Sequence, residues 1–183
     1  MTTVTRLYRV AGLDVSLTGT GIATRSGTTR VPTAGRRAAS LTERDARLRH
    51  ITDRVRDEVG HVDLVCIEGP VSYQQPGGST WDRAGLWWRI VSSFIGREIP
   101  VAVIPPTCRA LYATGSGGAR KTHVLEAAQQ RYGAILPTDD EADALILRAM
   151  GLDHLGQALA TVPPKNRGGL TGCQWPTLPE VTR

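Results

Sequence analysis

Residues 7–24 read LYRVAGLDVSLTGTGIAT, and this stretch does most to decide the class of fold. Residues 7–15 predict a β-strand, SLTGTG predicts a glycine-bearing turn, and residues 21–24 predict a second strand. TTRVPT (28–33) predicts a third strand. We expect it at a sheet edge, because Pro32 has no N–H to donate to a neighbouring strand. The chain therefore begins with antiparallel strands.

Strands and helices alternate after this start. VDLVCIE (62–68) is a nearly continuous apolar run, typical of a strand buried on both faces, and IPVAVIPP (99–106) predicts a short strand stopped by prolines. Apolar spacing predicts helices over residues 41–59, 82–97, 107–113, 120–132 and from about 139 onward. The helix over 82–97 is expected to turn Trp87, Ile90, Val91, Phe94 and Ile95 inward. This order predicts an α/β fold with a mixed β-sheet flanked by helices.

The length of 183 residues suits one domain with a substantial core. We expect residues 1–160 to form it and residues 161–183, rich in Pro and Gly, to form an irregular tail. No apolar run is long enough to span a membrane, and MTTVTRLYRV lacks the apolar core of a signal peptide. Three scattered cysteines without CxxC spacing are typical of a reducing compartment. The expectation is a cytoplasmic protein without membrane contact.

The net charge is +5, and only Lys121 and Lys165 are lysines. A basic chain favours a polyanionic partner such as nucleic acid. A genome rich in G and C also enriches arginine whatever the function, so charge alone leaves the partner open.

The stretch TDDEADALIL (138–147) holds four carboxylates, Asp139, Asp140, Glu141 and Asp143, where an apolar helix begins. Acidic residues in a first helical turn are stabilised by the helix dipole, and Asp139 is a candidate N-cap. Asp143 lies one turn after Asp140 at the edge of the apolar stripe, where a carboxylate is costly unless it is paired or bound to a metal. The segment alone leaves capping and a functional site equally open.

Two further carboxylates lie at strand ends. Asp14 ends the first strand and Glu68 ends the most apolar one; the alternatives are a turn residue for Asp14 and a structural ion pair for Glu68. Together with Asp140 and Asp143 they form a set of oxygen ligands that suits hard divalent cations such as Mg²⁺. Two such ions can promote phosphodiester cleavage.

Two segments carry candidate DNA contacts. TGSGGARKT (114–122) nearly matches a phosphate-binding P-loop, but Arg120 stands where that motif needs glycine. A glycine loop with Arg120 and Lys121 opening a helix still suits a DNA phosphate; the alternative is a flexible surface loop.

The other segment is SYQQPGGSTWDRAGLWWR (72–89). Tyr73, Trp81 and Trp88 are candidates for stacking on bases, whereas the helical spacing of Trp87 favours the core. Arg83 and Arg89 are candidates for phosphate contacts.

The ordered set of motifs resembles the RuvC-type Holliday-junction resolvases of the ribonuclease H-like nuclease group. The matching segments are GLDVSLTGTGIA (12–23), VCIEGP (65–70), ATGSGGARKTHV (113–124) and DEADAL (140–145), spread over about residues 7–152. The resemblance implies a ribonuclease H-like fold, a homodimer, and hydrolysis of four-way or other branched DNA with Mg²⁺, or Mn²⁺ as a substitute. It implies that the metal ligands are Asp14, Glu68, Asp140 and Asp143, with Lys121 near the scissile phosphate.

The chain departs from the family pattern at two places. The family often carries an aromatic residue three positions after its glutamate; here that position is Val71, and Tyr73 is the nearest substitute. The basic residue upstream of the glycine loop is out of register, and Arg109 is nearest to it, so Arg109 joins the candidate DNA contacts. A phage-type member that acts on varied branched DNA would fit these departures.

Two other classes of function compete. A non-catalytic protein that binds branched DNA would gain by losing its acidic residues, and this chain keeps all four. A kinase of the actin and sugar-kinase group has a turn similar to GLDVSLTGTG but needs two such domains, for which this chain is too short.

Overall fold

The computed structural model describes residues 6–70 and 79–178. A five-stranded sheet lies at its centre in the order β3-β2-β1-β4-β5. β1 pairs antiparallel with β2 and parallel with β4; β2 and β3 are antiparallel, and β4 and β5 are parallel. The strands are β1 (Val10–Asp14), β2 (Gly19–Thr24), β3 (Gly27–Pro32), β4 (Leu64–Glu68) and β5 (Val101–Ile104). The sheet is mixed and β3 lies at its edge, as predicted.

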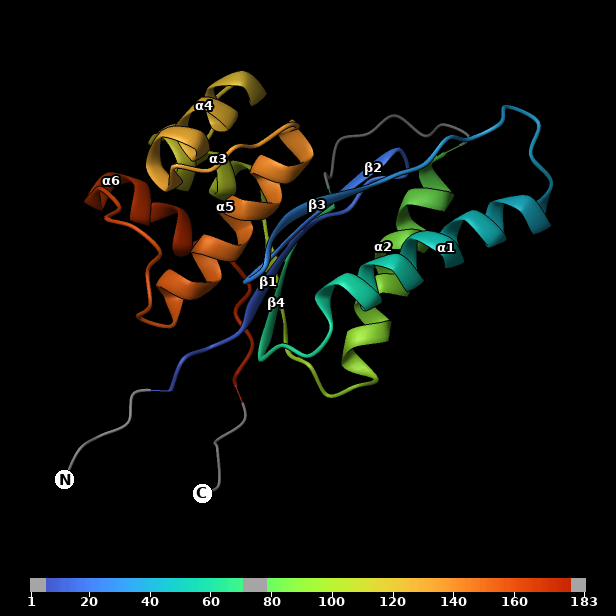
Figure 1. Cartoon of the computed structure of the whole chain (residues 1–183), viewed down its shortest axis with the longest axis horizontal. Helices are drawn as coiled ribbons and strands as arrows, with labels where there is room; N and C mark the ends of the chain where they lie inside the picture. Colours follow the sequence, from blue (N-terminus) through green and yellow to red (C-terminus); the bar gives the residue numbers. More distant parts are fainter. Residues whose placement is uncertain (1–5, 71–78, 179–183) are drawn as a thin grey trace.

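Helices cover both faces of the sheet (Figure 1). One face carries α1 (Leu41–Val59) and α2 (Thr80–Ile95), which bury Ile51 and Phe94 against Leu13 of β1. The other face carries α3 (Pro106–Thr114), α4 (Lys121–Tyr132) and α5 (Asp139–His154), with α6 (Pro164–Arg167) and the short 3₁₀ helix η1 (Gly168–Leu170) beside them. Among the described residues, no helix is both long enough and apolar enough to cross a lipid bilayer.

Glycines in β1 and β2 let α5 lie directly on the sheet. A Cβ at Gly12 would stand 2.1 Å from the carbonyl oxygen of Ala144, and one at Gly21 would stand 2.0 Å from that of Asp140. Any larger residue would push α5 away. The glycines of the first motif therefore fix the height of the acidic helix above the strand that carries Asp14.

Some predicted boundaries change. The prediction for α1 is confirmed at both ends, and Ser40 and Glu43 form a capping box at its start. The first strand is shorter than predicted, since it begins at Val10. The prediction that Ile95 faces inward is wrong, because α2 ends there and its side chain is 59% exposed.

The segment after residue 161 is not irregular throughout, so that prediction is wrong over residues 164–170. The buried side chain of Asn166 donates hydrogen bonds to the carbonyl oxygens of Tyr112 and Ala113 at the end of α3. Arg167 forms an ion pair with the buried Asp153 of α5 at 2.7 Å. Gln174 then exchanges two backbone hydrogen bonds with Val103 of β5. These contacts, which we call the C-terminal strap (residues 164–175), hold α3 against the domain.

Candidate active site

Two acidic residues lie side by side where parallel strands end. β1 and β4 run parallel with Leu13 opposite Ile67, so Asp14 and Glu68 come next at the same edge of the sheet. The strands themselves are buried, because both faces of the sheet are covered. Asp14 is only 8% exposed and Glu68 is partly buried. The sequence placed both residues at strand ends, and the structure brings them together.

The helix α5 adds the acidic residues of the late motif. It is capped by Thr138, whose hydroxyl accepts a hydrogen bond from the N–H of Glu141, and not by Asp139 as predicted. Asp143 is 2% exposed. Asp140, one turn earlier, is partly buried and accepts a hydrogen bond of 2.6 Å from Nε of Arg30 on β3. Glu141 points elsewhere, toward the hydroxyls of Thr138 and Thr28.

Burial, together with the neighbouring carboxylates, raises the pKa of two of these groups. Burial, together with the charges of Glu68 and Asp143, raises the pKa of Asp14 to about 8. Burial raises the pKa of Asp143 to about 7, with Arg109 opposing the shift and Glu68 adding to it. Each of the two carboxyls thus holds its proton more strongly than an isolated aspartate does. A bound cation would remove this tendency.

A buried arginine lies between the carboxylates. Arg109 of α3 is 7% exposed; its Nε donates to Oε1 of Glu68 at 2.5 Å, and its Nη1 donates to Oδ1 of Asp143. Burial lowers the pKa of Arg109, but the charges of Glu68 and Asp143 outweigh it and raise the pKa overall. The candidate DNA contact of the sequence is therefore an internal partner of the acidic cluster in this structure, and its side chain is not at the surface.

Lys121 lies at the other side of the cluster, at the first residue of α4. Its Nζ forms a hydrogen bond of 2.8 Å with Oδ2 of Asp139, which raises the pKa of Lys121 and lowers that of Asp139. The Lys121 side chain remains 65% exposed. Arg120, the residue before the helix, is exposed as well. Both cations can therefore meet a phosphate in solvent beside the buried acids.

The remaining candidate DNA contacts lie on or before α2. Arg83 and Arg89 are exposed on that helix, and Arg89 forms an ion pair of 2.9 Å with Asp45 of α1. Tyr73 and Val71 lie outside the described residues.

The donor atoms fit a hard divalent cation, although the side chains are not arranged around one. No three His, Cys, Asp or Glu side chains within residues 6–70 and 79–178 converge closely enough to hold a metal ion. Arg109 instead joins Glu68 to Asp143. The available donors are all carboxylate oxygens, which Mg²⁺ and Mn²⁺ prefer. Burial, and after it the charge of Glu68, raises the pKa values of Asp14 and Asp143 although Arg109 opposes the shift.

Comparisons with known proteins support the same architecture. No protein-family model and no curated protein matches the sequence. Among solved structures, RuvC of Thermus thermophilus is similar: 19% identity over 85% of this chain and 99% of that chain, with a TM-score of 0.60. The Thermus thermophilus RuvC in complex with a Holliday junction substrate is 18% identical over 86% of this chain and 100% of that chain, with a TM-score of 0.63. The chain has the RuvC fold. The predicted ribonuclease H-like sheet is thereby confirmed.

Within the RuvC fold of this chain, two arginines at the site were missed by sequence reasoning. Arg109 was predicted to contact DNA and no role was predicted for Arg30. In the structure Arg109 forms ion pairs with Glu68 and Asp143, and Arg30 forms one with Asp140. A signal for Arg109 was present: it stands among apolar residues in CRALYA (108–113), one helical turn after a strand ends. A charged residue in such a place usually has a buried partner. Arg30 carries no comparable signal, because edge strands often expose arginine.

Proposed function

We propose that the chain is a metal-dependent endonuclease that resolves Holliday junctions or other branched DNA. The observation that carries the proposal is the burial of Asp14 and Asp143 beside Glu68 at the carboxyl ends of β1 and β4, with Arg109 bridging Glu68 and Asp143, in a chain with the RuvC fold. The similar protein of Thermus thermophilus was solved with a Holliday junction substrate, which supports the choice of substrate.

The acidic residues are the proposed metal ligands: Asp14, Glu68, Asp140 and Asp143. When bound, a pair of Mg²⁺ ions supplies charge stabilisation for the attacking and leaving oxygens of phosphodiester hydrolysis. In that reaction a water oxygen forms a bond to phosphorus and one P–O ester bond breaks. Mn²⁺ is the expected substitute, because it accepts the same oxygen ligands.

The chain's own cations have separate tasks in this proposal. Lys121 and Arg120 stand at the solvent side of the acidic cluster, where they would contact non-bridging oxygens of the scissile phosphate and of its neighbour. Arg109 pairs with Glu68 and Asp143 from the interior, and Arg30 of the edge strand β3 pairs with Asp140. Arg83 and Arg89 on α2 are proposed contacts for the DNA beyond the site.

The experiment that tests this function compares labelled four-way junctions, flaps, forks and linear duplex, each with Mg²⁺ and with EDTA. We expect paired symmetric nicks in the junction with Mg²⁺ and none with EDTA. Cuts in many branched forms would favour the broader, phage-type activity. Binding without any cleavage in Mg²⁺ or Mn²⁺ would favour a non-catalytic branched-DNA binder, a function to which the Arg109 ion pairs would also be suited because they neutralise the site without metal.

We also propose that the protein acts as a homodimer. Trp81, Trp88 and Ile95 recur at seven-residue spacing along one side of α2 and are 81%, 61% and 59% exposed. Seven-residue spacing of large apolar side chains is typical of a helix that packs against another helix. A second copy supplies that helix by two-fold symmetry, and two sites related by such an axis match the two strands cut in a four-way junction.

A charged residue introduced among these three exposed apolar side chains of α2 tests the proposed dimer. We expect wild-type protein to sediment as a dimer and Trp88→Glu to sediment as a monomer, because a carboxylate in the centre of a helix–helix interface loses its hydration. Ile135→Glu is the matched control, since Ile135 is 93% exposed and lies outside α2. A monomeric wild type, or a dimeric Trp88→Glu, would contradict the proposal.

A further inference from the structure

Two cavities on the α1 and α2 face meet beside the active site. The first has a volume of about 520 Å³ and lies between residues 34–39, the start of α1 and the start of α2. The second has a volume of about 900 Å³ and reaches from the same place to Glu68. The two share Leu17, Gly35, Arg47 and Ser79 as lining residues, so they lie next to each other. We call them together the arginine groove.

The groove is predominantly positive. Five arginines line it, against three carboxylates; the arginines are Arg36, Arg37, Arg44, Arg47 and Arg83, and the carboxylates are Glu43, Glu68 and Asp82. A groove with an excess of guanidinium groups suits a ligand with repeated negative charges.

Two of the arginines, Arg44 and Arg47, donate hydrogen bonds to groups of the protein itself. Arg44 donates to both carboxylate oxygens of Asp82, at 3.0 and 2.6 Å, and so ties α1 to α2. Arg47 donates to the carbonyl oxygen of Leu17 and to the hydroxyl of Thr33, and so fixes the loop after β1. These contacts hold α1, α2 and the loop after β1 together at the side of the groove.

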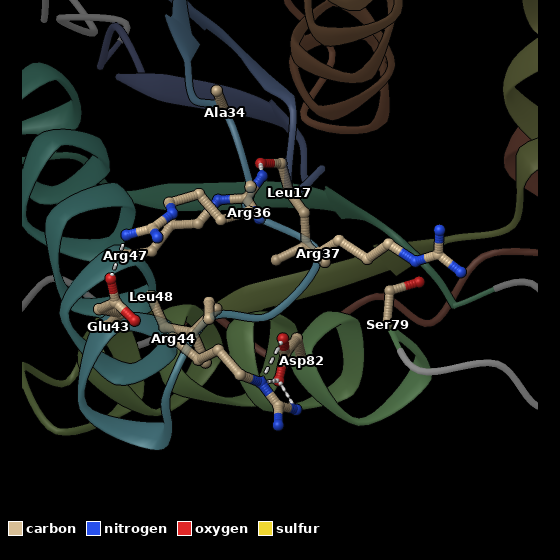
Figure 2. A pocket seen from close by; sticks show the side chains of 12 residues that line it. Leu17, Ala34, Arg36, Arg37, Glu43, Arg44, Arg47, Leu48, Ser79 and Asp82 are labelled. Carbon is tan, nitrogen blue, oxygen red and sulfur yellow. Dashed lines mark hydrogen bonds and ion pairs between the residues drawn. The ribbon is translucent and has the colours of Figure 1, made fainter.

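Two others face solvent. Arg36 is 79% exposed and has only a surface ion pair with Glu43. Arg37 forms no hydrogen bond or ion pair within the described residues, and Figure 2 shows its extended side chain on the side of the cavity where Ser79 lies. Surface ion pairs contribute little, so the guanidinium group of Arg36 can exchange Glu43 for a phosphate at small cost.

We propose that the arginine groove binds the phosphodiester backbone of the DNA that continues from the cleavage site, with Arg36 and Arg37 as its phosphate contacts. This inference rests on the proposed function and adds to it a path for the DNA. One end of the groove lies at Glu68, beside the acidic cluster. The strand therefore passes from the carboxylates over α2 to the segment before α1.

The test measures DNA binding apart from cleavage. Wild type and an Arg36→Ala/Arg37→Ala double variant are titrated with labelled four-way junctions in EDTA at several salt concentrations. Loss of two phosphate contacts should lower affinity about tenfold or more and reduce the slope of log affinity against log salt by about two. The control is Arg54→Ala/Arg56→Ala, which removes the same charge from exposed ion pairs elsewhere on α1 and should leave the slope nearly unchanged.

Junctions with progressively shorter arms locate the contact. If the groove holds DNA beyond the site, the deficit of the double variant should disappear once the relevant arm is too short to reach it. An unchanged slope in the double variant, or an equal loss in the control, would overturn the groove while leaving the nuclease intact. Wild type that cleaves in Mg²⁺ is the separate criterion for the proposed function, and wild type that binds no DNA would refute both.

Discussion

Asp143→Asn is expected to abolish DNA cleavage while keeping, or tightening, DNA binding. Asp143 is almost completely buried beside Asp14 and Arg109, and its carboxylate is a proposed metal ligand. The amide keeps the size of the side chain and can accept the hydrogen bond from Arg109, so the fold should survive. It removes one negative charge that repels both Asp14 and the DNA. Loss of such a group typically reduces turnover on the order of thousandfold or more.

Single-turnover cleavage of a four-way junction in Mg²⁺ measures the first effect, and anisotropy titration in EDTA measures the second. Asp57→Asn makes the same chemical change at an exposed position of α1 and serves as the control. A near-normal cleavage rate for Asp143→Asn would remove this residue from the site. Loss of both folding and binding would indicate a structural role instead.

Arg109→Met is expected to make folding stability depend on divalent cations. Methionine keeps much of the volume of the side chain but leaves Glu68 and Asp143 buried without their partner. Removing one member of a buried ion pair typically costs about 3–5 kcal/mol. Mg²⁺ that binds the carboxylates of the folded state should recover part of this loss, about 2.7 kcal/mol at a concentration 100 times its Kd.

Urea denaturation of wild type and variant, in EDTA and in Mg²⁺, gives the free energies of unfolding. Calorimetry should also show tighter Mg²⁺ binding to the variant, because the guanidinium no longer competes for the same oxygens. Arg148→Met is the control: Arg148 is partly buried and donates to the carbonyl oxygen of Val10, so its loss should be insensitive to Mg²⁺. If Mg²⁺ stabilises Arg109→Met no more than it stabilises wild type, the guanidinium group of Arg109 does not occupy the place of a metal ion between these carboxylates.

The sequence predicted well whatever depended on local pattern. Asp14 and Glu68 ended apolar runs, and adjacent parallel strands bring their ends to one edge, so two acidic residues of the site followed from strand assignment. Asp143 followed from its place on a helical face. The capping box of Ser40 and Glu43 is likewise local, and the α1 boundary was predicted to the residue.

The sequence-based prediction failed where the position of a side chain depends on residues far away in the sequence. Arg109 meets residues that are 41 and 34 positions away, and nothing in its neighbourhood tells which acids it faces. The C-terminal strap is rich in Pro and Gly, which favours an irregular assignment, yet Asn166 and Arg167 are ordered by groups on α3 and α5. Ile95 has the right spacing for the core, but α2 ends at this residue and its side chain is exposed.

The C-terminal strap also bears on how such a site can evolve. It holds the end of α3, and α3 carries the arginine that sits among the carboxylates. A substitution in residues 164–175 can therefore shift Arg109 without altering any acidic residue. The position of the guanidinium group among the four carboxylates thus depends on a segment that lies outside the acidic cluster.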